Sequence, residues 1–182
     1  MDKKSKQFVV FSLTNSIVIL AGLTAYIFIW NWIAIHADLA WLQQFEVWFV
    51  YSVQRAFGVP VDMTSPITLQ YYLPAPGFGV EIIALCTGVG EILFFAFLVL
   101  LFRGVGWRAK AKGLAVFLPV IFIENLLRLI FIYPLAVWFG VEAMWDTHWF
   151  MWKYGTFAVL MLLFSLWYML IARKELKSVL RR

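Results

Sequence analysis

Residues 113–139 read GLAVFLPVIFIENLLRLIFIYPLAVWF, and this stretch indicates the solvent in which the protein folds. Its only charged residues are Glu124 and Arg128. A helix needs roughly 20 mostly apolar residues to cross the hydrocarbon core of a bilayer. Three other stretches have a similar length and character, namely residues 8–35, 82–102 and 149–172. The sequence therefore predicts an all-α polytopic membrane protein with about four transmembrane helices.

The overall composition agrees with this fold class. Of the 182 residues, 64% are hydrophobic and 14% are charged. A soluble domain of this size does not have enough interior to bury so much apolar surface. The alternating segments of a transmembrane β-barrel are absent from the sequence, so helices must satisfy the backbone polar groups in lipid. No repeat or linker divides the sequence, and we expect residues 1–182 to form a single domain.

The distribution of basic residues predicts the orientation in the membrane. The net charge of +5 could indicate nucleic-acid binding, but the basic residues cluster beside the apolar stretches. They are Lys3, Lys4 and Lys6 before the first, Arg103, Arg108, Lys110 and Lys112 after the second, and Arg173, Lys174, Lys177, Arg181 and Arg182 after the last. Lysine and arginine flank transmembrane helices on the cytoplasmic side. We therefore expect a plasma or inner membrane protein with both termini and the 103–112 loop in the cytoplasm, and no nucleic-acid partner. Residues 8–35 are too long for a signal peptide, and we expect them to stay as an anchor.

A long segment between the first two stretches lies on the predicted outer side. Residues 37–57 have an apolar face and a polar face at helical spacing. Trp41, Leu42, Phe45, Trp48 and Phe49 form the apolar face, and Gln43, Gln44, Glu46, Gln54 and Arg55 form the polar face. Such a helix is typical of the membrane interface. We expect it to lie flat or to be partly re-entrant, with its apolar face in the membrane.

The chain that follows this helix predicts a small β-hairpin. Residues 67–73 alternate between apolar and polar side chains, as in a half-exposed strand. The run PAPGFG at residues 74–79 predicts a turn, and residues 80–84 predict a second strand. We expect the hairpin on the outer face, with its last strand leading to Cys86 at the start of the next helix.

Cys86 is the only cysteine in the chain, which excludes an internal disulfide and a cysteine-cluster metal site. The neighbouring Gly88 and Gly90 would let another backbone come close. A thiol at a helix N-terminus lies near exposed N–H groups, which favour the thiolate. Cys86 is therefore a candidate nucleophile, and the alternative is a buried cysteine that only fills space in an apolar helix.

Arg128 lies well inside the third apolar stretch. A charge at this depth costs on the order of 3 kcal/mol on insertion scales, so it needs a partner or a function. Glu124, one helical turn earlier, could be that partner in an ion pair. Counted from a cytoplasmic Gly113, Arg128 has climbed about 22 Å at the helical rise, which places it in the outer leaflet at the expected depth of Cys86. We therefore expect a functional role for Arg128.

His148 lies in the run WDTHW at residues 145–149, at the predicted outer start of the last stretch. A histidine at the interface can be inert, and this one alone would not indicate a site. With Cys86 and Arg128, however, it completes a set that comes from three stretches and converges on one face. A thiol, a base or acid beside it and a fixed cation for an oxyanion are the groups that acyl transfer through a thioester needs.

Three motifs that carry these residues resemble those of the exosortase/archaeosortase family. They are FGVEIIALCTG at residues 78–88, ENLLR at residues 124–128 and WDTH at residues 145–148. Members of this family are polytopic membrane cysteine enzymes, considered transpeptidases and unrelated in fold to the soluble sortases. The resemblance extends over about residues 37–172. It implies Cys86 as the nucleophile, with Arg128 and His148 as the other catalytic residues.

The resemblance also implies the kind of substrate. Family members process exported client proteins whose C-terminal signal consists of a short motif, a hydrophobic helix and a basic tail. We expect cleavage through a thioester on Cys86 and transfer to an acceptor, for which a membrane lipid is the expected candidate. Glu124 and Asn125 are expected to position Arg128, and no metal or organic cofactor is implied.

Two other functions stay open at this point. His36 and His148 could bind a b-type haem or a quinone in a four-helix bundle, although this leaves Cys86 and Arg128 without a role. The chain could also be a non-enzymatic membrane scaffold whose polar residues only fix helix packing. A visible spectrum would test the first alternative, and activity that survives the loss of Cys86 would favour the second.

Overall fold

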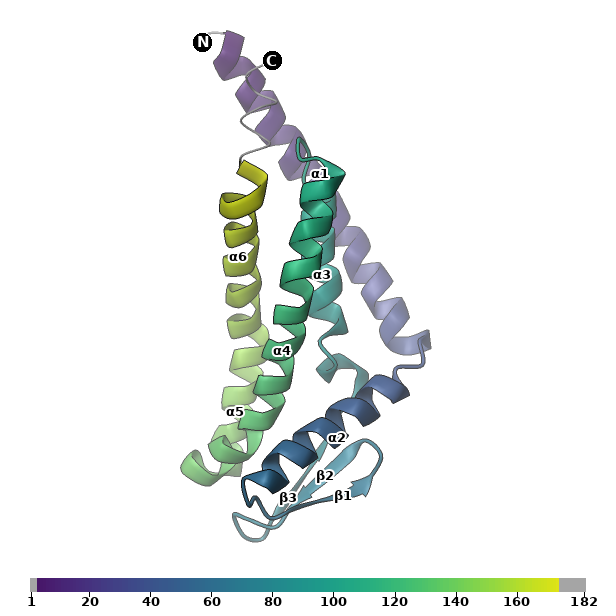
Figure 1. The fold of residues 1–182 in the computed structure, drawn as a ribbon, viewed down its shortest axis with the longest axis vertical. Helices are drawn as coiled ribbons and strands as arrows, with labels where there is room; N and C mark the ends of the chain where they lie inside the picture. The colour runs from purple at the N-terminus through teal and green to yellow at the C-terminus, as the bar shows by residue number, and fades with distance from the viewer. Residues whose placement is uncertain (1–2, 174–182) are drawn as a thin grey trace.

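The computed structural model describes residues 3–173, with side chains from residue 9 onward. Long helical elements dominate the fold (Figure 1): α1 (Lys3–His36), α3 (Val89–Leu101), α4 (Trp107–Phe139) and a last helix made of α5 (Val141–Phe150), η2 (Met151–Gly155), α6 (Thr156–Trp167) and η3 (Tyr168–Ala172). Three helices of this described part are long and apolar enough to cross a membrane: Val9–His36, Trp107–Phe139 and Val141–Ala172. The predicted all-α polytopic membrane fold is confirmed.

The second predicted span, residues 82–102, is only partly helical. α3 has 13 residues, which corresponds to about 20 Å at the helical rise. The short 3-10 turn η1 (Ala84–Cys86) precedes it, and Gly88, with a φ of 69°, stands directly before α3. Apolar composition does not distinguish an extended segment from a helix, and the left-handed glycine interrupts any helix that begins earlier.

The last helix begins earlier than the predicted residue 149. Gly140, with a φ of 85°, is the single residue between the end of α4 and the start of α5. The chain therefore reverses within one residue, and α5 runs back beside α4 (Figure 1). As a consequence, His148 lies within a helix and not in a loop before one.

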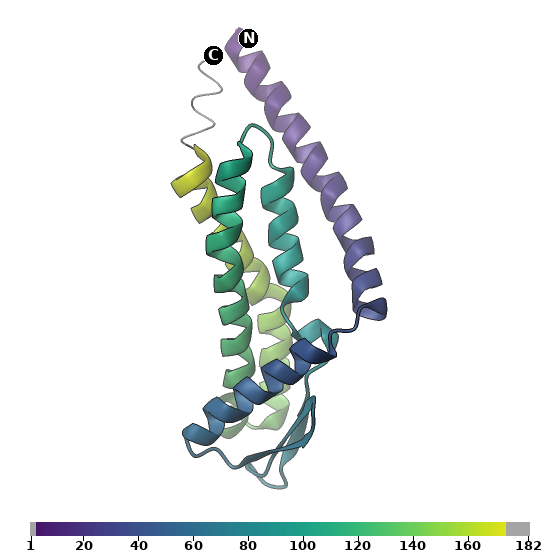
Figure 2. The same cartoon turned by 45° about the vertical axis from the view of Figure 1, so that its right-hand side comes forward.

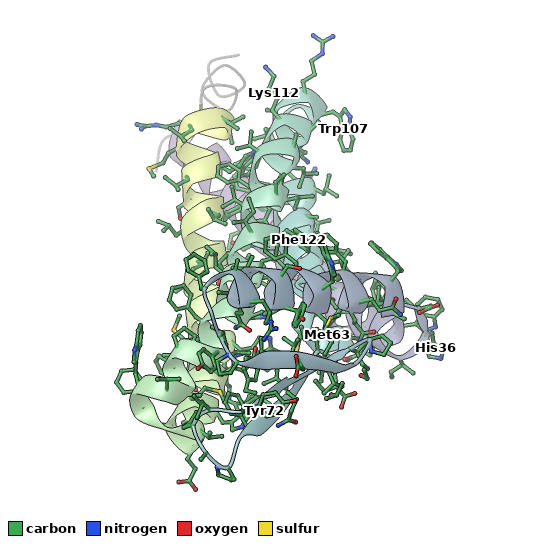
Figure 3. All side chains as sticks on the ribbon, turned by 60° about the horizontal axis from the view of Figure 1, so that its bottom comes forward. His36, Met63, Tyr72, Trp107, Lys112 and Phe122 are labelled. Carbon is green, nitrogen blue, oxygen red and sulfur yellow. The ribbon has the colours of Figure 1, made fainter. Side chains whose placement is uncertain are left out.

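The two ends of the molecule differ in content. The start of α1, the connection between α3 and α4 and the end of η3 lie at one end, here called the terminal end (Figures 1 and 2). The strands lie at the opposite end, the sheet end. Trp107 and Lys112 lie at the terminal end, whereas Met63 and Tyr72 lie at the sheet end (Figure 3). Residues 103–112 thus share an end with the start of α1, as the basic residues predict, although residues 107–112 belong to α4 and not to the expected loop. Lys174, Lys177, Arg181 and Arg182 lie outside the described residues.

A small antiparallel sheet, in the order β1-β2-β3, covers the sheet end. Its strands are β1 (Val61–Ser65), β2 (Thr68–Tyr71) and β3 (Phe78–Glu81). The predicted hairpin is the β2–β3 pair, in which Tyr71 faces Phe78 and Thr68 faces Glu81. The sequence did not predict β1, and the last strand ends at Glu81 and not at residue 84.

The helix α2 (Ala40–Ala56) crosses the bundle obliquely above the sheet (Figure 2). Trp41, Phe45 and Trp48 on its apolar face are exposed, as expected for a face in the membrane, whereas Leu42, expected on the same face, is buried against the protein. The polar face is partly buried against the protein, which differs from the expectation. Glu46 is 0% exposed and Gln54 is 2% exposed. These two side chains turn inward because α4 and the sheet offer them hydrogen-bond partners.

Gln54 satisfies a backbone group that a proline leaves without a partner. Pro134 lies inside α4 and has no N–H to donate to the carbonyl of Ile130, four residues earlier. The Gln54 Nε2 donates to this carbonyl at 3.0 Å. The Gln54 Oε1 accepts from the hydroxyl of the buried Tyr71 at 2.8 Å. The two bonds join α2 to the sheet and to the interrupted turn of α4.

Two apolar cores lie along the bundle. The core at the sheet end combines α2, the strands and the last part of α4, and Cys86 packs against it. The core at the terminal end combines α3, α4 and α6, with Phe95, Phe117 and Trp167 among its buried members. Along α4, Ile121 belongs to the second core and Leu129 to the first. Asn125 lies between them, and the polar residues of the candidate site gather around it.

Candidate active site

The segment before Cys86 is held from two sides. The Ile82 N–H donates to the carbonyl of Ile67 at 2.8 Å, and the Ile82 carbonyl accepts from the Gln43 Nε2 at 2.8 Å. The Cys86 N–H then closes the η1 turn on the carbonyl of Ile83 at 2.8 Å. The sheet and α2 therefore fix the backbone that carries the thiol.

Glycine is required just after the thiol. A Cβ atom on Gly88 would lie 3.1 Å from the Cβ of Asn125, and the φ of 69° at Gly88 is unfavourable for any other residue. This close approach lets the Asn125 Nδ2 reach the carbonyl of Cys86 at 2.9 Å. Gly88 was expected to let another backbone come close, whereas the group that comes close is the Asn125 side chain of α4.

Burial dominates the ionisation of the Cys86 thiol. The side chain is partly buried against the sheet-end core. Burial raises the pKa of the thiol, and the Ile83 backbone and the Arg128 cation oppose this rise. A thiolate favoured by the start of a helix was expected, but Cys86 is the last residue of η1, and Thr87 and Gly88 separate it from α3. The thiol is therefore mostly protonated near neutral pH and needs a base to become a nucleophile.

Arg128 is held by residues of three helices. Its Nη2 donates to the Asn125 Oδ1 at 2.6 Å, and its Nη1 donates to the Thr156 Oγ1 at 3.1 Å. The Nη1 also lies 3.6 Å from the Glu91 Oε1 of α3, the one ion pair within 4.0 Å found among the described residues. The Nε is buried and has no acceptor within the described part of the chain. The guanidinium thus has a fixed position, and its Nε–H is a donor without an acceptor among the described residues.

The sequence offered Glu124 as the ion-pair partner of Arg128, but the carboxylate at ion-pair distance from Arg128 is that of Glu91. Asn125 contacts Arg128 directly, as the positioning role expected of it requires. Glu124 instead lines a cavity of about 220 Å³ on the other side of Arg128, together with His148 and Met151. Spacing of one helical turn favoured Glu124, whereas packing brings the carboxylate of α3 nearer.

The three candidate residues line a single cavity of about 300 Å³. Cys86 comes from η1, Arg128 from α4 and His148 from α5. The remaining lining residues are Glu81, Ile83, Leu85, Trp145, Trp149 and Trp152. His148 packs edge-on against Trp145, with 6.0 Å between ring centroids. The structure therefore brings together the thiol, the cation and the imidazole that the sequence motifs single out.

His36 lies apart from this cavity. It ends α1 at the edge of the molecule (Figure 3), where its ring stacks on Trp32 and its Nδ1 lies 2.9 Å from the Trp32 carbonyl. None of the cavities that His148 lines includes His36. The arrangement gives no support to a haem or quinone site shared by the two histidines.

Sequence reasoning missed Glu46. This carboxylate reaches the site from α2, where its Oε1 accepts from the Asn125 Nδ2 at 3.1 Å. The sequence did contain a signal for its position. Glu46 lies four residues after Leu42 and four residues before Val50, and both of these apolar residues are buried. Neighbours at this spacing share one face of a helix, so Glu46 could have been assigned to the buried side.

Comparison with known proteins identifies the family. A family model of transmembrane exosortases matches residues 11–168. No curated protein and no solved structure matches the chain. The matched region contains Cys86, Arg128 and His148, together with η1, α4 and α5, which carry them. The protein is therefore a member of the transmembrane exosortase family.

Proposed function

We propose that the protein is a membrane-embedded cysteine transpeptidase that cleaves the C-terminal sorting signal of exported client proteins through a thioester. The observation that carries this proposal is the cavity shared by Cys86, Arg128 and His148. A nucleophile, a cation with an unused donor and an imidazole around one space are the groups that acyl transfer requires.

The first half of the reaction uses all three side chains. His148 accepts the proton of the Cys86 thiol, and the sulfur attacks the carbonyl carbon of the scissile peptide. The negative charge that develops on the carbonyl oxygen is stabilised by Arg128, whose buried Nε–H has no acceptor in the described part of the chain. The intermediate collapses to a thioester, the C–N bond breaks, and His148 gives its proton to the leaving amine.

The second half resolves the thioester. An acceptor amine or hydroxyl attacks the thioester carbonyl, His148 takes the acceptor's proton, and the Cys86 sulfur leaves and is reprotonated. We propose a membrane lipid as the acceptor, with water as the competing nucleophile. The tryptophans at positions 145, 149 and 152 line the cavity and reduce the access of water to it.

The proposed site faces the outside of the cell membrane. Arg103, Arg108 and Lys112 lie at the terminal end, which the positive-inside rule places in the cytoplasm. The cavity is lined from η1 and α5, which lie toward the sheet end (Figure 1). A client whose hydrophobic helix crosses the bilayer and whose basic tail remains inside would present its short motif at this depth.

A trapping experiment tests the proposal. Membranes that contain the protein and a client are incubated with hydroxylamine, which converts a thioester into a hydroxamate on the newly formed carboxyl end. We expect client hydroxamate with the wild-type protein and none with Cys86→Ala. Ser165→Ala serves as the control, because this exposed residue of α6 only bonds its own helix. Wild-type client processing in Cys86→Ala would instead favour a non-enzymatic scaffold.

A further inference from the structure

Glu46 is a carboxylate that the proposed chemistry does not use. It is 0% exposed, and only its Oε1 accepts a hydrogen bond, from the Asn125 Nδ2. Its Oε2 is buried and has no partner among the described residues. Glutamate is almost never fully buried unless it is paired, because burial without partners is unfavourable. The position of Glu46 therefore calls for a functional explanation.

The contacts of Asn125 indicate what Glu46 does. The two ends of this amide differ, since the Nδ2 can only donate and the Oδ1 can only accept. The Nδ2 faces two acceptors, the Glu46 Oε1 and the Cys86 carbonyl, while the Oδ1 faces the Arg128 Nη2. A reversed amide would oppose donor to donor at Arg128 and acceptor to acceptor at the other two groups. Glu46 thus contributes to a single orientation of Asn125.

We propose that Glu46 is a positioning residue of the active site, which holds the Asn125 amide and through it the Arg128 side chain and the Cys86 backbone. The proposal rests on the function inferred above for Cys86 and Arg128. It makes α2 a part of the catalytic apparatus, although none of its residues lines the cavity. The opposite face of α2 exposes Trp41, Phe45 and Trp48 to the surrounding membrane. The helix α2 thus lies between the membrane and the site.

The ionisable groups around Glu46 fit this role. Arg128 of α4, Glu91 of α3 and Cys86 of η1 interact with it electrostatically, while Asp62 of the neighbouring β1 is exposed. Burial raises the pKa of Glu46 to about 8, and the Asn125 hydrogen bond and the Arg128 cation oppose the rise. Glu46 is therefore mostly neutral near pH 7. A neutral acid can accept from Asn125 without competing with Glu91 for the guanidinium.

The test uses two readouts on the intact protein in membranes or detergent. The first is client turnover per folded molecule, resolved into kcat and KM. The second needs no client: because Cys86 is the only cysteine, the rate of its alkylation by iodoacetamide against pH reports this thiol alone. The variants are Glu46→Leu and Glu46→Gln. The matched control is Gln54→Leu, which removes the other buried polar side chain of α2 but touches no site residue.

The two Glu46 variants are expected to behave differently. Glu46→Leu removes one of the three contacts that orient the Asn125 amide, so kcat should fall by about tenfold or more, the loss typical of a hydrogen bond that supports a charged group, with little change in KM. Glu46→Gln keeps an acceptor for Asn125 and should retain most of the turnover. It also removes a carboxylate that disfavours the thiolate, so its alkylation profile should shift to lower pH. Gln54→Leu should lower thermal stability and leave both readouts at wild-type values.

The results decide between positioning and packing. If Glu46→Leu and Gln54→Leu lose stability alike and keep wild-type kcat, or if the Glu46→Gln alkylation profile coincides with that of the wild type, the positioning role is wrong. If Cys86→Ala still processes client, the proposed transpeptidase is wrong, and the alkylation profiles still show whether Glu46 acts on Cys86. Should Glu46→Leu fail to fold, the Glu46→Gln profile gives the decision.

Discussion

The side-chain amide of Asn125 donates to the backbone carbonyl of Cys86 at 2.9 Å, across 39 positions of the chain. The amide reaches that carbonyl because the neighbouring Gly88 has no side chain. The same amide binds Arg128 through its oxygen. One residue of α4 therefore sets the distance between the proposed nucleophile and the cation that would stabilise its oxyanion.

The first prediction concerns this close approach. Gly88→Ala should destabilise the protein and abolish processing, because its Cβ would meet Asn125 at 3.1 Å and separate Arg128 from Cys86. The control is Gly58→Ala. Gly58 has a similar φ of 76°, but a Cβ there has no neighbour within 4 Å. Both variants carry a backbone penalty of about 1–2 kcal/mol, and Gly88→Ala adds the clash with Asn125, so its melting temperature should fall at least as far as that of Gly58→Ala. Processing should be lost only in Gly88→Ala, and equal activity of the two variants would contradict the role of the contact.

The second prediction separates charge from geometry at Arg128. Arg128→Lys should be nearly inactive, because an ammonium lacks the planar donors that bind Asn125 and leave the Nε–H for an oxyanion. Loss of one oxyanion donor typically costs about 3 kcal/mol of transition-state stabilisation, or roughly a hundredfold in rate. Client turnover is compared in membranes that hold equal amounts of each variant.

Two further variants complete this comparison. Arg108→Lys, an exposed change at the terminal end, should be silent. The double change of Glu91→Gln with Arg128→Gln removes both members of the ion pair and should stay inactive even when the protein folds. Activity restored by that double change would reduce Arg128 to a structural partner of Glu91.

The third prediction concerns orientation. In a Cys86→Ala background the chain has no other cysteine, so a single introduced thiol reports its own side of the membrane. Met63→Cys in β1 should react with a membrane-impermeant maleimide on intact cells, and Lys112→Cys should react only after permeabilisation. Met63 and Lys112 lie at opposite ends of the molecule (Figure 3) and both are exposed. Labelling of Lys112→Cys on intact cells would reverse the proposed topology.

The fourth prediction concerns stability against pH. The pKa of Glu46 is raised from 4.5 to about 8 in the folded protein, so between these values the folded state holds a proton that the unfolded state has released. The free energy of unfolding should therefore fall as the pH rises from about 4.5 to 8 and should not fall further above that range because of this group. Thermal melts in detergent measure it. Glu46→Gln should flatten this dependence, and Asp62→Asn, on the exposed surface of β1, should not.

The spans and the candidate site could be predicted from the sequence for different reasons. Span length and composition are local properties of the chain, so three long helices and the amphipathic α2 follow from hydropathy alone. Arg128 stands out by itself as a charge in apolar surroundings, whereas Cys86 and His148 indicate a site only together with it. Their convergence followed from counting helical rise from the basic loop, and the shared cavity agrees with it.

The parts that were missed depend on tertiary packing. The alternation of Val61, Asp62, Met63 and Thr64 extends over only four residues, and β1 forms where β2 offers it an open edge. Residues 82–88 are as apolar as a helix, but their backbone is held by Gln43 and Ile67. The direction of Glu46 depends on which helices are neighbours, and no local pattern contains that information.

The order of the polar partners along the chain has a consequence for biosynthesis. Glu46, Gln54 and Glu91 all precede α4, whereas Thr156 follows it. When the ribosome delivers α4 to the membrane, the counterion of Arg128 and the donor for the carbonyl freed by Pro134 have already been synthesised. The charged helix α4 can therefore pair with these partners as soon as it enters the membrane. A truncated chain that ends after α4 should already hold Arg128 in the bilayer, whereas α4 alone should insert poorly.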